Sequence, residues 1–145
     1  MADSCDVDIK IKKDDKGTWV ASCDKKLYLL SSHDRFHLKV KADGWTFDGN
    51  AAQPPINSYG TDETDASKYV NLKAPDGTTT GVWVYDPDSN FTVQNDNRSD
   101  DPPKLGIHDS KADTILEHAF LVCLKQTGTG TGTCVLDPLV KDKEL

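Results

Sequence analysis

Two aromatic residues within residues 81–86 are well suited to binding a ligand. Trp83 and Tyr85 share one face of an expected strand, and Val82 and Val84 share the other. Exposed aromatic rings on a strand could stack on a sugar ring or anchor a protein partner. The alternative is that one pair fills the hydrophobic core while the other packs under a loop. The two interpretations differ in how far Trp83 and Tyr85 reach solvent.

The segment that follows is a candidate calcium site. Asp86, Asp88 and Asn90 place side-chain oxygens at alternate positions, as calcium-binding loops do. The pattern is not an EF-hand, because Phe91 stands where that motif needs glycine and Asn97 stands where it needs glutamate. A loop-bound calcium of another type and a solvated acidic loop both fit these residues.

Four cysteines are candidates for two disulfides. If the first expected hairpin is centred on Asp14, Cys5 lies opposite Cys23, and the last hairpin places Cys123 opposite Cys134. Either pairing could bring the Cα atoms within the roughly 4.4–6.8 Å that a disulfide needs. Disulfides would imply an oxidising compartment, whereas reduced cysteines would pack as small hydrophobic residues. No pair has the spacing of a CxxC redox motif.

Histidines provide the only suggestion of catalysis. Ser32, His33 and Asp34 contain the residue types of a hydrolytic triad, and His108 is a second candidate base. A triad is assembled in space, however, and neighbours on an extended chain point in opposite directions. We therefore expect no enzyme and assign no catalytic residue; a small hydrolase using His33 or His108 is the remaining alternative.

Length and charge limit the classes of partner. The chain has 145 residues, a formal net charge of -7 and a pI near 4.9, and this length is expected for one domain spanning residues 1–145. An acidic surface repels nucleic-acid phosphates and anionic membranes, so we expect neither as a partner. Residues 1–5 lack the basic and apolar regions of a signal peptide. The expected compartment is cytoplasmic, or periplasmic or secreted if the natural chain starts earlier.

A central alternating stretch at residues 35–47 is the strongest structural signal. Its apolar residues are Phe36, Leu38 and Val40, followed in the opposite phase by Trp45 and Phe47. Alternation is typical of a strand with one buried face. The change of phase predicts either a β-bulge at Gly44, which we favour, or a hairpin with Asp43 and Gly44 at its tip.

Further short apolar runs separated by turn residues predict an all-β fold. The expected strands lie near residues 7–11, 19–23, 27–30, 69–72, 81–86, 90–95, 116–124 and 134–140, with a short edge strand near 105–107. A long polar connection covers residues 48–67. Seven to nine strands of this kind predict an antiparallel β-sandwich with Greek-key connections, of immunoglobulin-like or cupredoxin-like shape.

Two parts of the chain resemble the DP-EP family. They are the alternating central stretch with its Gly44-Trp45-Thr46-Phe47 motif, and the terminal hairpin that closes on Leu136-Asp137-Pro138-Leu139-Val140. This family contains small, mostly bacterial β-sandwich domains of immunoglobulin-like or cupredoxin-like shape. The resemblance implies that fold and carries no established activity, so it assigns no site residue. The cysteine-bearing hairpins and the long middle loop depart from the family pattern.

The cupredoxin-like outline raises the question of copper. A blue-copper site needs two histidines, a cysteine and usually a weak axial methionine. The only methionine is Met1, and no histidine follows Cys123 or Cys134, where such sites normally place one. We expect no cofactor.

Together these features predict a non-catalytic binding or interaction module. Its partner is an unknown protein or carbohydrate, and its oligomeric state stays open. The alternative is a carbohydrate- or calcium-binding sandwich that uses Trp83 and Tyr85 with the loop of Asp86, Asp88 and Asn90.

Overall fold

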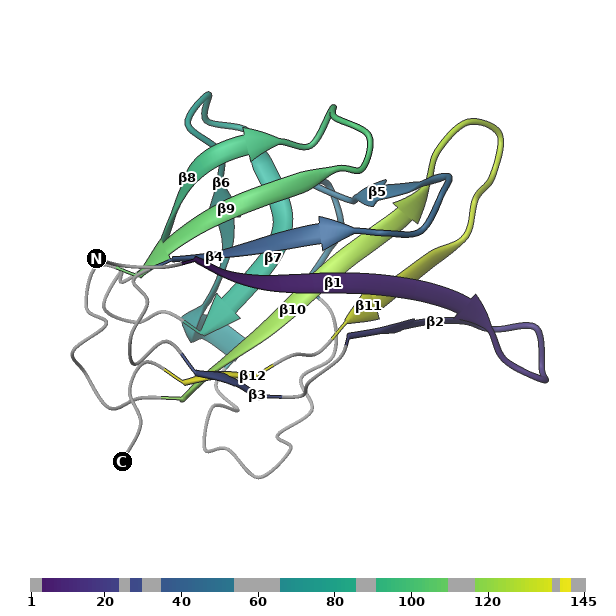
Figure 1. Cartoon of the computed structure of the whole chain (residues 1–145), viewed down its shortest axis with the longest axis horizontal. Helices are drawn as coiled ribbons and strands as arrows, with labels where there is room; N and C mark the ends of the chain where they lie inside the picture. The colour runs from purple at the N-terminus through teal and green to yellow at the C-terminus, as the bar shows by residue number, and fades with distance from the viewer. Residues whose placement is uncertain are drawn as a thin grey trace.

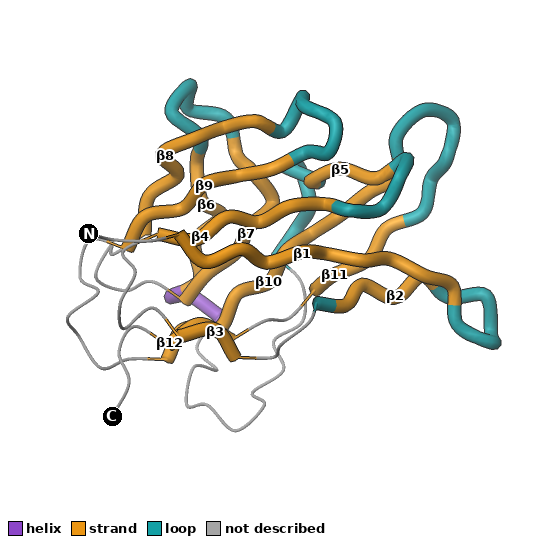
Figure 2. Tube along the Cα trace, in the orientation of Figure 1, coloured by secondary structure: helices purple, strands orange, loops and turns teal. Residues whose placement is uncertain are grey.

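The computed structural model describes residues 4–23, 27–29, 35–53, 66–85, 91–109, 117–136 and 139–141. These residues form two β-sheets packed face to face, with one short 3-10 helix, η1 (Ala66–Lys68) (Figures 1 and 2). The strands are β1 (Ser4–Lys13), β2 (Trp19–Ser22), β3 (Leu27–Leu29), β4 (Arg35–Val40), β5 (Trp45–Phe47), β6 (Tyr69–Lys73), β7 (Thr79–Tyr85), β8 (Phe91–Asn97), β9 (Lys104–Asp109), β10 (Glu117–Gln126), β11 (Thr133–Leu136) and β12 (Leu139–Lys141). Within the described ranges, no helix has the length and apolar character needed to cross a membrane.

The expected all-β sandwich is confirmed, and its strand count is higher than predicted. One sheet has five strands in the order β2-β1-β4-β9-β8. The other has seven, in the order β3-β12-β10-β7-β6, with β5 and β11 also paired to β10. The twelve described strands replace the predicted seven to nine because several are only three or four residues long.

Two strand pairs are parallel, which corrects the expectation of a purely antiparallel sandwich. They are β1 with β4 and β12 with β3. A parallel pair joins segments that are distant along the chain, so turn residues and hairpin patterns do not reveal it. The chain also changes sheets between β2 and β3, β3 and β4, β4 and β5, β7 and β8, and β9 and β10. Such crossings between layers are typical of Greek-key sandwiches.

The main core lies between the two sheets. Its most deeply buried side chains are Val7, Ile9, Phe36, Leu38, Val40, Leu105 and Ile107 from the five-stranded sheet and Val82, Val84, Phe120, Val122 and Leu124 from the seven-stranded sheet. Burial alternates along β4 as the sequence predicted. Phe120 lies near the centre, with edge-to-face ring contacts to Phe36 and Phe91 at centroid distances of 5.1 Å each.

The phase change after Val40 marks a change of sheet, and both the predicted bulge and the predicted hairpin are wrong. β4 ends at Val40 in the five-stranded sheet, whereas β5 begins at Trp45 and pairs with β10 in the other sheet. Gly44 has a φ of +80° in the turn between them. Because the chain crosses from one layer to the other, the inward direction reverses, and both strands direct apolar residues into one core.

The first hairpin closes later than the sequence predicted. Lys13 pairs with Trp19, and the Asp14 N–H donates to the Thr18 carbonyl at 2.9 Å. The Asp14 carboxylate accepts the backbone N–H groups of Lys16 and Thr18, both at 2.9 Å. Asp14 therefore starts the turn instead of forming its centre.

This register separates the first cysteine pair. Continued by one residue, it places Cys23 opposite Ile9, whereas the backbone of Cys5 pairs with Phe36 of β4. Cys5 and Ile9 are about 13 Å apart along an extended strand, beyond the Cα separation that a disulfide spans. The predicted opposition of Cys5 and Cys23 is therefore wrong; the Cys5 side chain itself lies outside the described part of the structure.

The last hairpin differs from its predicted register by one residue. Leu124 pairs with Cys134 and Cys123 pairs with Val135. A shift of one residue turns every side chain to the other face, so Cys134 packs against the main core while Cys123 is buried on the opposite face of β10. The predicted opposition of Cys123 and Cys134 is wrong for this reason. Within the described part of the chain, no disulfide involves Cys23, Cys123 or Cys134.

Cys134 is expected to react slowly with alkylating reagents. Burial raises the pKa of its thiol to about 11, and the thiolate is the reactive form. At pH 8 we expect iodoacetamide to label it about 200-fold more slowly than an ordinary thiol with a pKa of about 8.5, because its thiolate fraction is lower by that factor. Mass spectrometry of time-quenched samples measures this rate. Labelling in the native protein as fast as in urea would contradict the burial.

Candidate functional site

Trp83 and Tyr85 lie in a second, smaller hydrophobic cluster on the outer face of the seven-stranded sheet. Val82 and Val84 point into the main core and have 0% exposure. Trp83 and Tyr85 are half-buried and pack against Tyr69 of β6 and Leu121 of β10. The rings of Tyr69 and Tyr85 meet edge to face at 5.6 Å. The rings of Trp83 and Tyr85 are therefore partly covered by their neighbours and are not fully exposed on this face.

The indole N–H of Trp83 lies in the interior of this smaller cluster. This Nε1–H is buried and finds no hydrogen-bond acceptor among the residues that the structure describes. Leaving such a buried donor unsatisfied is unfavourable.

Other predicted site residues fall partly outside the described ranges. Asp86, Asp88, Asn90 and His33 all belong to segments that the structure does not describe. His108 is half-buried on β9, where it pairs with β4 and β8. Among the described residues, no three His, Cys, Asp or Glu side chains are grouped as metal ligands would be.

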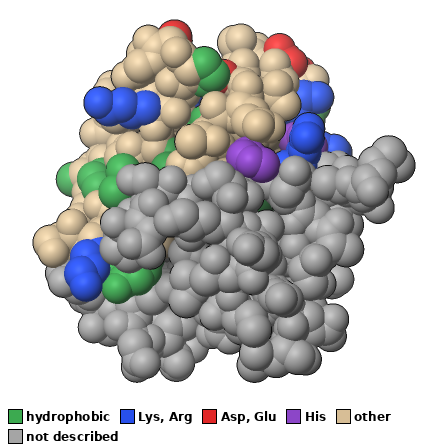
Figure 3. Space-filling view, turned by 90° about the vertical axis from the view of Figure 1, so that its left-hand side faces the viewer, with side chains coloured by type: hydrophobic (Ala, Val, Ile, Leu, Met, Phe, Trp, Pro, Cys, Tyr) green, Lys and Arg blue, Asp and Glu red, His purple; other side chains and the backbone are tan. Residues whose placement is uncertain are grey.

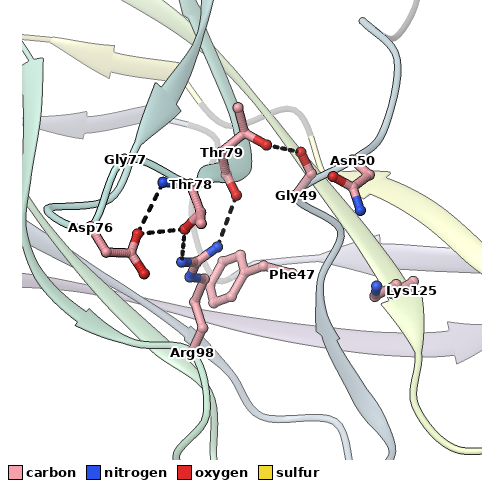
Figure 4. Close-up of a pocket in the computed structure, with 9 residues that line it drawn as sticks. All are labelled: Phe47, Gly49, Asn50, Asp76, Gly77, Thr78, Thr79, Arg98 and Lys125. Atoms are coloured by element: carbon pink, nitrogen blue, oxygen red, sulfur yellow. Dashed lines mark hydrogen bonds between the residues drawn. The ribbon is translucent and has the colours of Figure 1, made fainter.

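Arg98, at the end of β8, contacts the turn between β6 and β7 in the other sheet, and Figure 4 shows its hydrogen bonds to Thr78 and Thr79. Its Nε and Nη2 donate to the two carboxylate oxygens of Asp96 at 2.7 and 2.8 Å. Its Nη1 donates to the Thr79 carbonyl at 2.8 Å, and Nη2 also donates to the Thr78 hydroxyl at 2.7 Å. The Thr78 hydroxyl in turn donates to Asp76 at 2.6 Å. We call these residues the arginine cluster; it links the end of β8 to the turn between β6 and β7.

The loop after β5 is seated against the same region of β7. The carbonyl of Gly49 accepts hydrogen bonds from the Thr79 hydroxyl and from Asn71 Nδ2, the latter at 3.2 Å. A Cβ at Gly49 would lie 2.3 Å from the Thr79 carbonyl oxygen, and one at Gly81 would lie 2.3 Å from the Asp48 carbonyl oxygen. Glycine is therefore required at both positions for the two backbone segments to approach this closely.

An open hollow of about 670 Å³ lies between the arginine cluster and this loop. Lys125 and Asn50 line the side away from Arg98, with Phe47 between (Figure 4). The charge of Arg98 is matched by Asp96, and Asp76 adds a further carboxylate. An anion would therefore meet little net attraction here, and we interpret the arginine cluster as a structural clasp.

Hydrogen bonding sets the charge states of this clasp. The side chain of Arg98 lowers the pKa of Asp96 from its usual value, and the Thr78 hydroxyl lowers the pKa of Asp76. The bonds to Asp96 raise the pKa of Arg98 in return. A carboxyl whose folded pKa lies below its unfolded value of about 3.9 stabilises the fold above that pH, and the stabilisation is lost as pH falls through the folded pKa.

Replacing Arg98 by methionine is expected to lower the free energy of unfolding at pH 7 by about 2 kcal/mol, because charge-assisted bonds to a half-buried carboxylate are lost. Stability should also become less dependent on pH between about pH 5 and 2. Urea unfolding across this range measures both effects. Lys125→Met on the exposed side of the hollow is the matched control, and equal behaviour of the two variants would contradict the clasp.

A mainly apolar groove of about 340 Å³ opens on the other side of the β6–β7 turn, between the edge strands β6 and β8. It is lined by Val70, Asn71, Leu72, Lys73, Pro75, Phe91, Thr92 and Val93. Val70 pairs with the fully buried Val84 and so lies on the core face of β6, yet it is 46% exposed. The two sheets are therefore not closed over Val70.

Both strands beside this groove are the outermost described strands of their sheets. An edge strand directs part of its backbone N–H and C=O groups away from the sheet, where another extended chain can pair with them. Each strand is interrupted by a register shift, between Asn71 and Lys73 in β6 and between Val93 and Asn95 in β8. These irregularities restrict regular pairing to short segments. Figure 3 shows hydrophobic side chains reaching the surface beside basic ones on one face of the described part.

Sequence reasoning missed both the groove and the clasp. Residues 69–72 were expected to form a strand, but nothing local distinguishes an edge strand from a central one. The turn between β6 and β7 has a composition typical of turns, whereas its link to Arg98 joins residues about twenty positions apart.

No protein-family model matches the chain, and no curated protein matches it in sequence. The geometry of the described residues is therefore what supports a function.

Proposed function

We propose that this protein is a non-catalytic interaction module that binds a protein partner through the open side of the sandwich. The observation that carries the proposal is the groove between β6 and β8, where Val70 faces the core yet is 46% exposed. Burying apolar surface of this kind is the main favourable term in protein association. An immunoglobulin-like or cupredoxin-like shape and membership of the mostly bacterial DP-EP family belong to the same proposal.

A pull-down with the purified protein tests this function. The chain offers a matched control, because Val20 is 47% exposed on β2, far from the groove along the sheet order. We expect proteins captured by the wild type and by Val20→Lys to be lost with Val70→Lys. Quantitative mass spectrometry of the captured proteins provides the comparison. Capture that is equal in all three would show that the groove is not the binding surface.

A carbohydrate site on the outer face is the second candidate. Trp83 and Tyr85 place two half-buried aromatic rings there, beside the buried Tyr69. Rings of this kind bind sugars by stacking. A glycan array with the wild type and with Tyr85→Ala tests this candidate: a signal lost in the variant supports it, and an absence of signal from the wild type contradicts it.

Calcium binding by Asp86, Asp88 and Asn90 stays a prediction, as does a hydrolase using His33 or His108. Calcium should raise the melting temperature of the wild type and leave that of Asp88→Ala unchanged, because a ligand that binds only the folded state stabilises it. Equal melting curves with and without calcium would remove this candidate.

A further inference from the structure

The charge around the groove between β6 and β8 differs from that of the whole chain. The protein has a net charge of -7, yet among the described residues that line the groove Lys73 is the only charged one. Lys68 precedes β6 directly, so exposed lysines stand at both ends of this five-residue strand. Opposite charges on a partner would be attracted to both ends, while a second copy of this acidic chain would be repelled overall.

The shape of the site favours an extended chain. Tyr69, Val70 and Asn71 pair in regular antiparallel register with β7, and the other side of β6 has no neighbour among the described strands. Alternate N–H and C=O groups of an edge strand point away from its sheet, and a peptide strand can pair with them. Side chains of such a peptide would alternate between the groove and the outer face.

The residues that line the groove determine which kind of side chain it accepts. Its inner wall consists of Leu72, Phe91 and Val93, which are 4–7% exposed, and Val70 forms its open rim. An aliphatic side chain of the peptide would cover Val70 and bury the apolar surface that the two sheets leave exposed. A volume of about 340 Å³ is at the lower end for ligand pockets.

We propose that the open edge of β6 binds an extended segment of a partner protein, with an aliphatic side chain beside Val70 and acidic residues against Lys68 and Lys73. This inference rests on the proposed function and names the partner's chemistry. Affinity comes from backbone pairing and apolar burial, and the lysines select acidic over basic segments. The register shift before Lys73 limits the pairing to a short segment.

Fluorescence anisotropy with three labelled hexapeptides at low salt tests the proposal. The probes are Glu-Val-Thr-Val-Thr-Glu, the same peptide with lysine at both ends, and the acidic peptide with both valines replaced by glycine. We expect the first to bind at least about tenfold more tightly than the other two. No binding by any probe, or equal binding by the acidic and basic probes, would overturn the proposal.

Substitutions in β6 test whether the peptide binds to this strand. Val70→Asp should lower the affinity for the acidic peptide by about tenfold or more. Val20→Asp, at an equally exposed valine, should leave that affinity unchanged. Lys73→Glu should lower the affinity for the acidic peptide by about fivefold and raise the affinity for the basic peptide. A variant that failed to fold would not bind the basic peptide more tightly. An unchanged affinity in Val70→Asp would overturn the proposed site.

Two further outcomes identify a different occupant. Self-association in sedimentation experiments that is lost in Val70→Asp would assign the groove to a second copy and overturn the inference. Proteins captured in a Val70-dependent pull-down, together with no binding of any hexapeptide, would contradict the peptide inference alone and leave the interaction function intact.

Discussion

Replacing Phe120 by alanine is expected to lower the free energy of unfolding by about 4 kcal/mol. Phe120 has 0% exposure and lies between the two sheets, on the strand that pairs with four others. Its ring meets Phe36 and Phe91 edge to face, so the substitution removes buried area and two aromatic contacts. Urea unfolding followed by tryptophan fluorescence measures the change.

The matched control for this substitution lies in the same hairpin. Val135→Ala in β11 removes apolar surface from a side chain that is 39% exposed, and it should cost less than about 1 kcal/mol. A loss below about 2 kcal/mol in Phe120→Ala would mean that the sheets do not pack through this ring.

Replacing Gly81 by alanine is expected to lower the free energy of unfolding by about 3 kcal/mol. Gly81 has a φ of +84°, and a Cβ there would lie 2.3 Å from the Asp48 carbonyl oxygen. The left-handed conformation costs a residue with a side chain about 1–2 kcal/mol, and forcing the loop away from β7 adds about 1–3 kcal/mol. Thermal and urea unfolding at pH 7 measure the loss.

Gly77→Ala separates these two causes. Gly77 has a nearly equal φ of +89°, but a Cβ there would have nothing within 4 Å. We expect it to cost only the conformational part, about 1–2 kcal/mol. If the two alanine variants are equally stable, the loop that contains Asp48 does not pack against β7.

The buried face of individual strands was predicted correctly from the sequence. The alternation of Phe36, Leu38 and Val40 identified the core face of β4, and each is 1% exposed. The division of β7 into a valine face and an aromatic face is present in the structure, with Val82 and Val84 in the main core. Side-chain alternation is a property of a single strand, so it can be recognised without knowing the strand's neighbours.

Register and pairing were predicted less well. The cysteine pairings depended on where two hairpins turn, and the observed turns differ by enough to move Cys23 away from Cys5 and to turn Cys134 away from Cys123. The backbone N–H groups of Lys16 and Thr18 donate hydrogen bonds to the Asp14 carboxylate, and these bonds decide the first turn. Several turn positions were compatible with the composition, and their small energy differences are not visible in the residue types.

Residue types and their alternation were sufficient to establish an all-β sandwich and which side of its central strands is buried. They could not establish that the chain changes sheets at Gly44, that β1 lies parallel to β4, or that Arg98 joins β8 to the β6–β7 turn. They also could not show that Val70, a core-facing residue of an edge strand, stays open to solvent. Each of these features depends on which distant segments become neighbours, and burial of the whole apolar surface, not the preference of any one segment, selects that arrangement.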